Sequence, residues 1–160
     1  METYQAMILA RVVHILGVII WIGGVAFVTL VLIPALRRHP DKTLRITLFE
    51  QLEGRFAFIA KITTLMAGLS GFYLVEMLDA WSRYTSLQFW WMHLMTLVWM
   101  IFSLVLFVFE PLFLHRWYHQ HAKQDCDGTF RVMQRLHVIL LTLSLIAVAG
   151  AMAGAHGFVF

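Results

Sequence analysis

Four apolar stretches, each long enough to cross a membrane as an α-helix, make up most of this chain. They run from about residue 6 to 36, 56 to 78, 87 to 114 and 132 to 155. A spanning helix needs about 20 predominantly apolar residues, because each residue rises about 1.5 Å and the hydrocarbon layer is about 30 Å thick. The sequence therefore predicts an all-α integral membrane protein, with one domain over residues 1–160 and helices at about 6–36, 41–79, 87–116 and 130–155.

The composition agrees with a membrane protein. Of the 160 residues, 61% are apolar and 13% are charged. An ordinary soluble domain is about half apolar and about a quarter charged, so that class is excluded. The lone cysteine, Cys126, cannot form an internal disulfide.

The segment before the second apolar stretch also has the pattern of a helix. From Asp41 onward, apolar residues recur at helical spacing with charged residues between them, so the second helix is expected to begin well before Phe56 and to project out of the membrane. Pro34 and Pro111 fall at the ends of the first and third stretches, where a missing N–H is tolerated near the interface. Because all connections are short, an up-and-down four-helix bundle is expected.

Lys and Arg are distributed unevenly over the connections. Arg11 and Arg83 lie on one side, and both termini are expected outside on that side, because basic residues favour the cytoplasmic side. The basic residues behind the net charge of +3 are thus explained by the orientation of the chain in the membrane. No nucleic-acid partner is expected, since no binding motif accompanies the charge. Ten of the twelve basic residues lie in or beside the other two links: Arg37, Arg38, Lys42, Arg45, Arg55, Lys61, Arg116, Lys123, Arg131 and Arg135.

Ionisable side chains inside the apolar stretches are the candidate functional residues: His14, Lys61, His93, Glu110 and His137. A charged group at the centre of a spanning helix costs roughly 2.5–3.5 kcal/mol on insertion scales, so each of them suggests a function. The first and third helices enter from outside, so His14 and His93 are expected at similar depth on the outer side. Lys61 and His137 are expected at similar depth on the inner side.

His14 and His93 are the candidate ligands of a haem. In an up-and-down bundle the first and third helices lie diagonally across the core, so the two imidazoles could face each other across the space that a flat macrocycle fills. His14, Gly17, Trp21 and Gly24 share one stripe of the first helix, and a glycine one turn from a ligand lets a planar group approach the backbone. The pattern predicts haem b with His14 and His93 on the iron and with Gly17 and Trp21 beside it.

Two other interpretations of these residues remain open. Intramembrane histidines and small-residue stripes also serve plain helix packing, and the chain would then be a cofactor-free structural subunit of a larger membrane complex. A copper(I) site built from histidine and thioether sulfur is the second alternative. The methionines that lie toward the outer side are Met7, Met92, Met95 and Met152.

The polar residues of the inner half also have more than one interpretation. His137 could ligate a second haem, with Lys61 as the partner ligand or as the counter-charge to a propionate. A simple ion pair between Lys61 and Glu110, which offsets the cost of burying either charge, is favoured over that role. The three residues could also carry protons to the inner side. Farther along, His115 and His119 stand one turn apart, but no third ligand completes a known metal-binding pattern, and solvated interface residues are expected there.

The order of these features resembles the superfamily of the HemJ-type bacterial protoporphyrinogen oxidases and the related copper-resistance protein D (CopD) domain. His14 is followed by Trp21, Gly23 and Gly24, similar to the family's early helix, and Trp91-Met92-His93 is similar to its Trp-x-His-x-Lys segment. The resemblance implies b-type haem bound with help from His14. Further similar segments precede the second and fourth helices: Phe49, Glu50, Glu53 and Arg55, and Phe130-Arg131.

One departure from the family pattern bears on activity. Met95 stands where HemJ-type sequences have a lysine, and the acidic residue and proline expected at the start of the fourth helix are replaced around Arg135 and His137. If that lysine handles the substrate, the departure argues against protoporphyrinogen oxidation but leaves the implied scaffold and haem site unchanged. Any enzymatic activity is expected to be that of an oxidoreductase.

The main expectation is a multi-pass protein of the bacterial cytoplasmic membrane that binds haem b and transfers electrons. Its partners, besides the lipid bilayer, would be quinone, a porphyrinogen or a larger respiratory complex. In such a site the iron performs the redox chemistry, and the protein sets the potential through its ligands, a low dielectric and hydrogen bonds.

Overall fold

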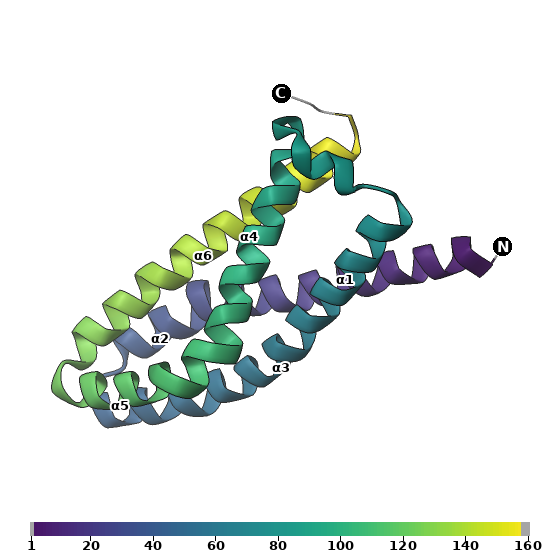
Figure 1. Ribbon diagram of the computed structural model, residues 1–160. Helices are drawn as coiled ribbons and strands as arrows, with labels where there is room; N and C mark the ends of the chain where they lie inside the picture. Colours follow the sequence, from purple (N-terminus) through teal and green to yellow (C-terminus); the bar gives the residue numbers. More distant parts are fainter. Residues whose placement is uncertain (1, 158–160) are drawn as a thin grey trace.

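The computed structural model describes residues 2–157, with side chains described for all of these except residues 2, 113–116 and 119. Within this part the chain is all-α, and no strand occurs in it. Its elements join into four long helices connected by short links (Figure 1). Each long helix contains a segment that is long and apolar enough to cross a membrane.

The first long helix comprises α1 (Glu2–Phe27), the π-helical segment η1 (Val28–Leu32) and α2 (Ile33–Arg38), and the second is α3 (Lys42–Met77). The third comprises α4 (Trp90–Leu104), the π-helical segment η4 (Val105–Leu114) and α5 (His115–Gln124), and the fourth is α6 (Cys126–Ala155). Two short 3-10 helices, η2 (Trp81–Thr85) and η3 (Leu87–Phe89), occupy the link between α3 and α4.

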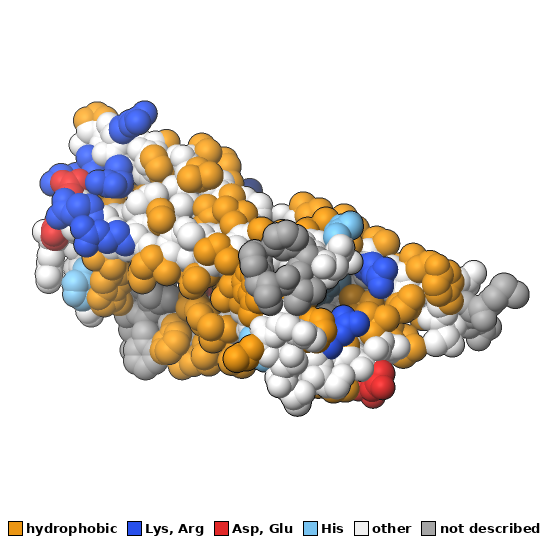
Figure 2. Space-filling view, turned by 90° about the horizontal axis from the view of Figure 1, so that it is seen from above, with side chains coloured by type: hydrophobic (Ala, Val, Ile, Leu, Met, Phe, Trp, Pro, Cys, Tyr) orange, Lys and Arg blue, Asp and Glu red, His pale blue; other side chains and the backbone are white. Residues whose placement is uncertain are grey.

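The long helices pack as two pairs. α1 packs along α3 and α4 packs along α6, while α1 with α6 and α3 with α4 make the contacts between the pairs. The first and third long helices therefore lie diagonally across the bundle. Figure 1 shows the pairs meeting at the end that carries α2 and α5 and diverging toward the end that carries both termini. Figure 2 shows Lys and Arg gathered at the former end, so the two ends are named the basic end and the terminal end.

Aspartate caps set the helix boundaries at the basic end. The Asp41 carboxylate accepts hydrogen bonds from the backbone N–H groups of Thr43 and Leu44, so α3 begins at Lys42, close to the expected start. The Asp125 carboxylate accepts one from the N–H of Gly128 at 2.8 Å. The third helix consequently continues to Gln124 instead of ending near 116, and the fourth begins at Cys126 instead of near 130.

The two π-helical segments occur where the long helices contain proline. Pro111 lies inside η4, and Pro34 follows η1, so neither proline ends its long helix. In η1 the N–H of Ile33 bonds to the carbonyl of Val28, and the same register would pair residue 34 with the carbonyl of Thr29. Proline has no N–H, and the Thr29 carbonyl instead accepts a hydrogen bond from Gln134 Nε2 at 2.8 Å. This bond ties η1 to α6.

The basic end has a tightly packed core of its own. Burial raises the pKa of the Tyr118 hydroxyl, and the nearby carboxylate of Glu50 raises it further. Arg45 is buried beside this core, where it donates to Asp127 Oδ1 at 2.7 Å and to the carbonyl of His39. The core joins the first, second, third and fourth long helices through Val28, Leu32, Ile33, Leu36, Phe49, Tyr118, Ala122, Cys126 and Phe130.

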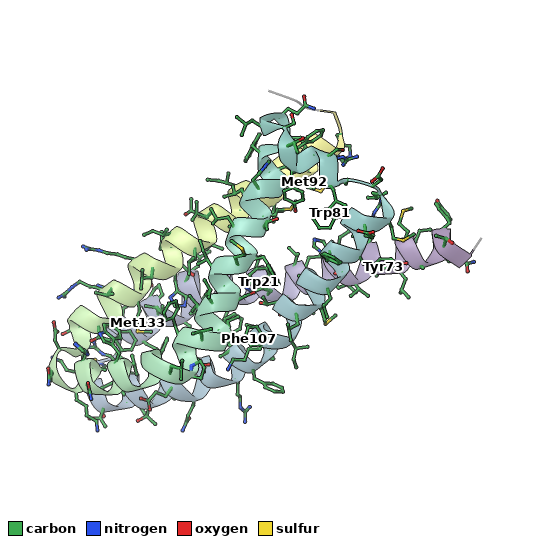
Figure 3. The ribbon with its side chains drawn as sticks, in the orientation of Figure 1. Trp21, Tyr73, Trp81, Met92, Phe107 and Met133 are labelled. Carbon is green, nitrogen blue, oxygen red and sulfur yellow. The ribbon has the colours of Figure 1, made fainter. Side chains whose placement is uncertain are left out.

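The middle of the bundle has a second core, and its outer surface is apolar. Trp21 packs edge-to-face on Phe102, with ring centroids 4.8 Å apart, and Figure 3 shows Trp21 between α1 and α4. Outward, Leu30, Phe58 and Leu69 are 66%, 66% and 72% exposed. Four apolar helices with such a surface are those of a multi-pass membrane protein, in which lipid covers the exposed apolar side chains.

We predict that Gln134→Leu destabilises the protein by about 1–3 kcal/mol, because it leaves the Thr29 carbonyl without a partner in an apolar environment. Pro34→Ala restores a backbone N–H at the start of α2 that can donate to the Thr29 carbonyl, so Gln134→Leu is expected to cost clearly less in that background. Thermal unfolding of the purified protein in detergent, followed by circular dichroism, measures both values. Equal costs in the two backgrounds would contradict this explanation of the Gln134 bond.

Candidate functional site

His14 lies on α1 and is held against α3. Its Nδ1 is 2.9 Å from the carbonyl oxygen of Ala67 and 3.3 Å from Ser70 Oγ. A carbonyl oxygen only accepts, so Nδ1 carries the proton and Nε2 carries a lone pair. Among the described residues, Nε2 has no hydrogen-bond partner. Gly71 makes room for the ring, since a Cβ there would lie 3.0 Å from His14 Cε1.

His93 lies near the start of α4 and is held by the link between α3 and α4. Its Nε2 is 3.0 Å from the carbonyl oxygen of Tyr84, and its Nδ1 is 3.3 Å from that of Phe89. A neutral imidazole has one N–H, so it satisfies only one of these carbonyls at a time. The Tyr84 ring packs edge-to-face on His93, and the Tyr84 hydroxyl donates to Thr96 Oγ1 at 2.8 Å, because Thr96 itself donates to a backbone carbonyl.

His14 and His93 lie at similar depth, but each is bonded to a different part of the fold. From the contact between Trp21 and Phe102, His14 is about 10 Å away along α1 and His93 about 14 Å away along α4, at about 1.5 Å per residue. Both therefore lie on the terminal side of that contact, where the helix pairs diverge. The structure does not bring the two imidazoles into a hydrogen bond or a ring contact with each other.

Gly17 and Trp21 have different surroundings. A Cβ on Gly17 would lie 3.2 Å from the carbonyl oxygen of Thr63 and 3.3 Å from the backbone nitrogen of Ala67, so Gly17 is a close contact between α1 and α3. Trp21 is only 4% exposed, and its indole N–H has no hydrogen-bond partner in the described part of the chain. A buried donor of this kind is available to a polar atom of a ligand or to water.

Aromatic rings of the chain itself lie against most of the other bundle glycines. A Cβ on Gly68 would lie 2.5 Å from Trp99 Nε1, which donates to the carbonyl of Thr64 at 3.0 Å. Gly150 and Gly154 are covered in the same way by the indoles at the start of α4, and Gly24 by Phe56. The described contacts thus give the small residues a role in helix packing.

Lys61 and Glu110 form the predicted ion pair. Lys61 Nζ on α3 lies 2.6 Å from Glu110 Oε2 on η4, and the two side chains are 30% and 27% exposed. The interaction links the second and third long helices one residue before Pro111. It supplies each charge with a partner inside an apolar segment, where an unpaired charge is costly.

His137 is separate from that ion pair. It is half-buried on α6, and its Nδ1 donates to the carbonyl of Met133 in the same helix at 2.9 Å. No hydrogen bond or ion pair joins it to Lys61 in the described structure. The neighbouring Gln134, which the sequence interpretation did not single out, makes the contact between helices instead.

The other histidines do not form a metal site among the residues described. Groups of three or more His, Cys, Asp or Glu side chains suited to a metal ion are absent from that part of the chain. The side chains of His115 and His119 lie outside the described residues, so the solvated position expected for them is not tested. His121 stacks on Trp117, and His39 and His156 make local backbone contacts.

Three buried polar atoms of the bundle lack partners in the described structure, and only one of their residues, Trp21, was among the predicted site residues. Trp21 Nε1, Thr64 Oγ1 and Ser103 Oγ are buried without a hydrogen-bond partner in the described structure. They come from α1, α3 and α4, and Trp21 and Thr64 are among the most buried residues. Their residue types were visible in the apolar stretches, but only the packing shows that they lack partners.

Comparisons of this chain with protein-family models, with curated proteins and with solved structures found no match. The resemblance to the superfamily of HemJ-type and CopD proteins therefore stays a prediction.

We predict a favourable interaction of about 1–3 kcal/mol between Lys61 and Glu110 in a double-mutant cycle. Lys61→Met leaves the carboxylate unpaired and Glu110→Gln leaves the ammonium unpaired, so each single variant loses stability. The double variant is expected to lose less than the sum of the two, because it removes both charges. Unfolding by sodium dodecyl sulfate, followed by circular dichroism, measures the four proteins, and additive losses would contradict the pairing.

Proposed function

We propose that this chain is an electron-transfer protein of the bacterial cytoplasmic membrane that binds at least one haem b. His14 and His93 are the axial ligands in this proposal. The observation that carries it is the hydrogen bond from His14 Nδ1 to the carbonyl of Ala67. That bond fixes the tautomer in which Nε2 is free to bind iron, and metal-ligating histidines usually have such a second partner.

His93 fits the proposal only if Nδ1 is the oriented nitrogen and Nε2 is released from its present partner. Its Nδ1 lies near the carbonyl of Phe89, so the ring can be oriented by that carbonyl while Nε2 binds iron. Nε2 must then leave the carbonyl of Tyr84, which belongs to the link that joins the diverging ends of α3 and α4. Haem binding in this form requires the link at residues 81–85 to move.

The remaining residues of the candidate site have supporting roles. The unpaired indole N–H of Trp21 is available to a polar atom of the bound group. The backbone of α3 fills the space beside Gly17. Gly17 therefore allows α1 to approach α3 closely, and this close approach positions His14. We assign Lys61 a structural role, since Glu110 is its partner, and we give His137 no ligand role.

A bound haem supplies one-electron chemistry, and the chain supplies two imidazole ligands and an apolar environment that influences the potential. The electron partner in this proposal is quinone or a larger respiratory complex. Protoporphyrinogen oxidation is not proposed, because Met95 replaces the lysine of the HemJ-type segment.

The proposal is tested by absorption spectra of the detergent-purified protein, oxidised and then reduced with dithionite. We expect a sharp Soret band that shifts on reduction, with a narrow band near the boundary of green and yellow. His14→Ala and His93→Ala each remove an iron ligand, and haem per protein is expected to fall at least about tenfold. His156→Ala is the matched control, because His156 is exposed and bonds only within its own helix.

Circular dichroism of each variant separates loss of haem from loss of fold. A full haem complement in both folded ligand variants would overturn the ligand assignment. A colourless wild-type protein without iron would overturn the haem proposal; elemental analysis would then favour a copper site if copper is bound, and a structural subunit if it is not.

The orientation in the membrane is proposed with both termini outside and the basic end in the cytoplasm, because basic residues favour that side. We predict that a membrane-impermeant maleimide labels Ser82→Cys in intact cells and labels Lys123→Cys only after the membrane is opened. Both positions are exposed, and Cys126→Ser provides the background without other cysteines. The reverse labelling pattern would overturn the orientation.

A further inference from the structure

A hollow of about 320 Å³ lies at the basic end, between α5 and the first turns of α6. Trp117 and His121 line it from α5, with their rings stacked at 4.9 Å, and Arg131 and Arg135 line it from α6. The proposed function uses none of these residues.

The charge of this hollow is positive. Arg131 and Arg135 stand one turn apart and are exposed, and neither forms a hydrogen bond or an ion pair in the described part of the structure. Asp125 also lines the hollow, but its carboxylate caps α6 through the N–H of Gly128. Lys42 and Arg45, by contrast, are paired with Asp127.

The hollow also lies where the apolar surface begins. In the sequence, the apolar stretch of the third long helix ends at about residue 114, three residues before Trp117. Val132 lines the hollow and is 44% exposed, and further exposed apolar residues follow on α6. Aromatic and basic side chains are typical of this level, where lipid headgroups meet the acyl chains.

We propose that this hollow binds the phosphate group of an anionic phospholipid, with Arg131 and Arg135 contacting the phosphate oxygens. Basic pockets between helices on the cytoplasmic side suit such headgroups, and arginine suits phosphate geometry. A lipid is favoured over a free anion because apolar surface adjoins the basic residues and accommodates the acyl chains. The inference depends on the membrane orientation proposed above, but it does not depend on haem.

A second hollow at the same end gives the matched control. It is lined by Pro34, Arg37 and Arg38, which come from one turn of α2, and it has no aromatic side chain. Arg37→Gln/Arg38→Gln therefore removes the same charge from the same end as Arg131→Gln/Arg135→Gln.

The test is a titration of the detergent-purified protein with phosphatidylglycerol, and separately with phosphatidylcholine, followed by the rise in the unfolding temperature. We expect phosphatidylglycerol alone to stabilise the wild type at low concentration. Each basic residue near a lipid phosphate contributes about 1 kcal/mol, so Arg131→Gln/Arg135→Gln should raise the half-maximal concentration about ten- to thirtyfold. The control pair should change it less than about threefold.

Three outcomes would overturn the proposal. They are an unchanged midpoint in the folded Arg131→Gln/Arg135→Gln variant, an equal loss in the control pair, and an equal response to phosphatidylcholine. Inorganic phosphate provides a further arm: if it alone gives the same stabilisation at similar concentration, the site binds free phosphate and the lipid assignment is wrong. The haem spectrum of the variant should be unchanged, which separates this test from that of the proposed function.

Discussion

The structure depends most on the need to give every buried backbone carbonyl and N–H a hydrogen-bond partner. In an apolar environment an unpaired polar group is costly. Each interruption of the backbone hydrogen bonds in a long helix therefore requires another hydrogen-bond partner. Pro34 removes one backbone N–H, and Gln134 from another helix donates to the carbonyl of Thr29. Trp99 likewise donates to the carbonyl of Thr64, although no proline is nearby. Several contacts between long helices are therefore side chains bonded to backbone groups.

The same requirement governs the histidines in the apolar segments. His14, His93 and His137 each have Nδ1 near a backbone carbonyl. In His14 and His137 this leaves Nε2 available for other chemistry, whereas in His93 Nε2 also lies 3.0 Å from the carbonyl of Tyr84. Only the carbonyl bonded to His14 belongs to another long helix, so His14 both ties α1 to α3 and presents a fixed tautomer. A packing role and a ligand role are compatible at this residue, because they use different nitrogens.

The sequence predicts the helices better than it predicts their rotation. Hydropathy identifies four apolar stretches, and charge compensation correctly pairs Lys61 with Glu110. The third helix continues past its expected end because a single residue, Asp125, separates it from the fourth helix and caps that helix. Hydropathy does not predict such a cap. The partners of His14 and Gly17 depend on which face of α1 packs against α3. The spacing of small residues predicts that this face packs against a helix, but it does not predict which helix.

The two ends of the bundle differ in how firmly they are closed, and this difference bears on where a ligand can enter. At the basic end, Arg45 and Asp127 join α3 to α6 over a buried aromatic core. At the terminal end the helix pairs diverge, and the short link contacts His93 through the carbonyl and the ring of Tyr84 and through the carbonyl of Phe89. Moving that link breaks hydrogen bonds and ring contacts of Trp81 and Tyr84 but no ion pair of the described structure, whereas opening the basic end would break the Arg45–Asp127 pair and expose a packed core. A planar group between the first and third long helices would therefore enter from the terminal end.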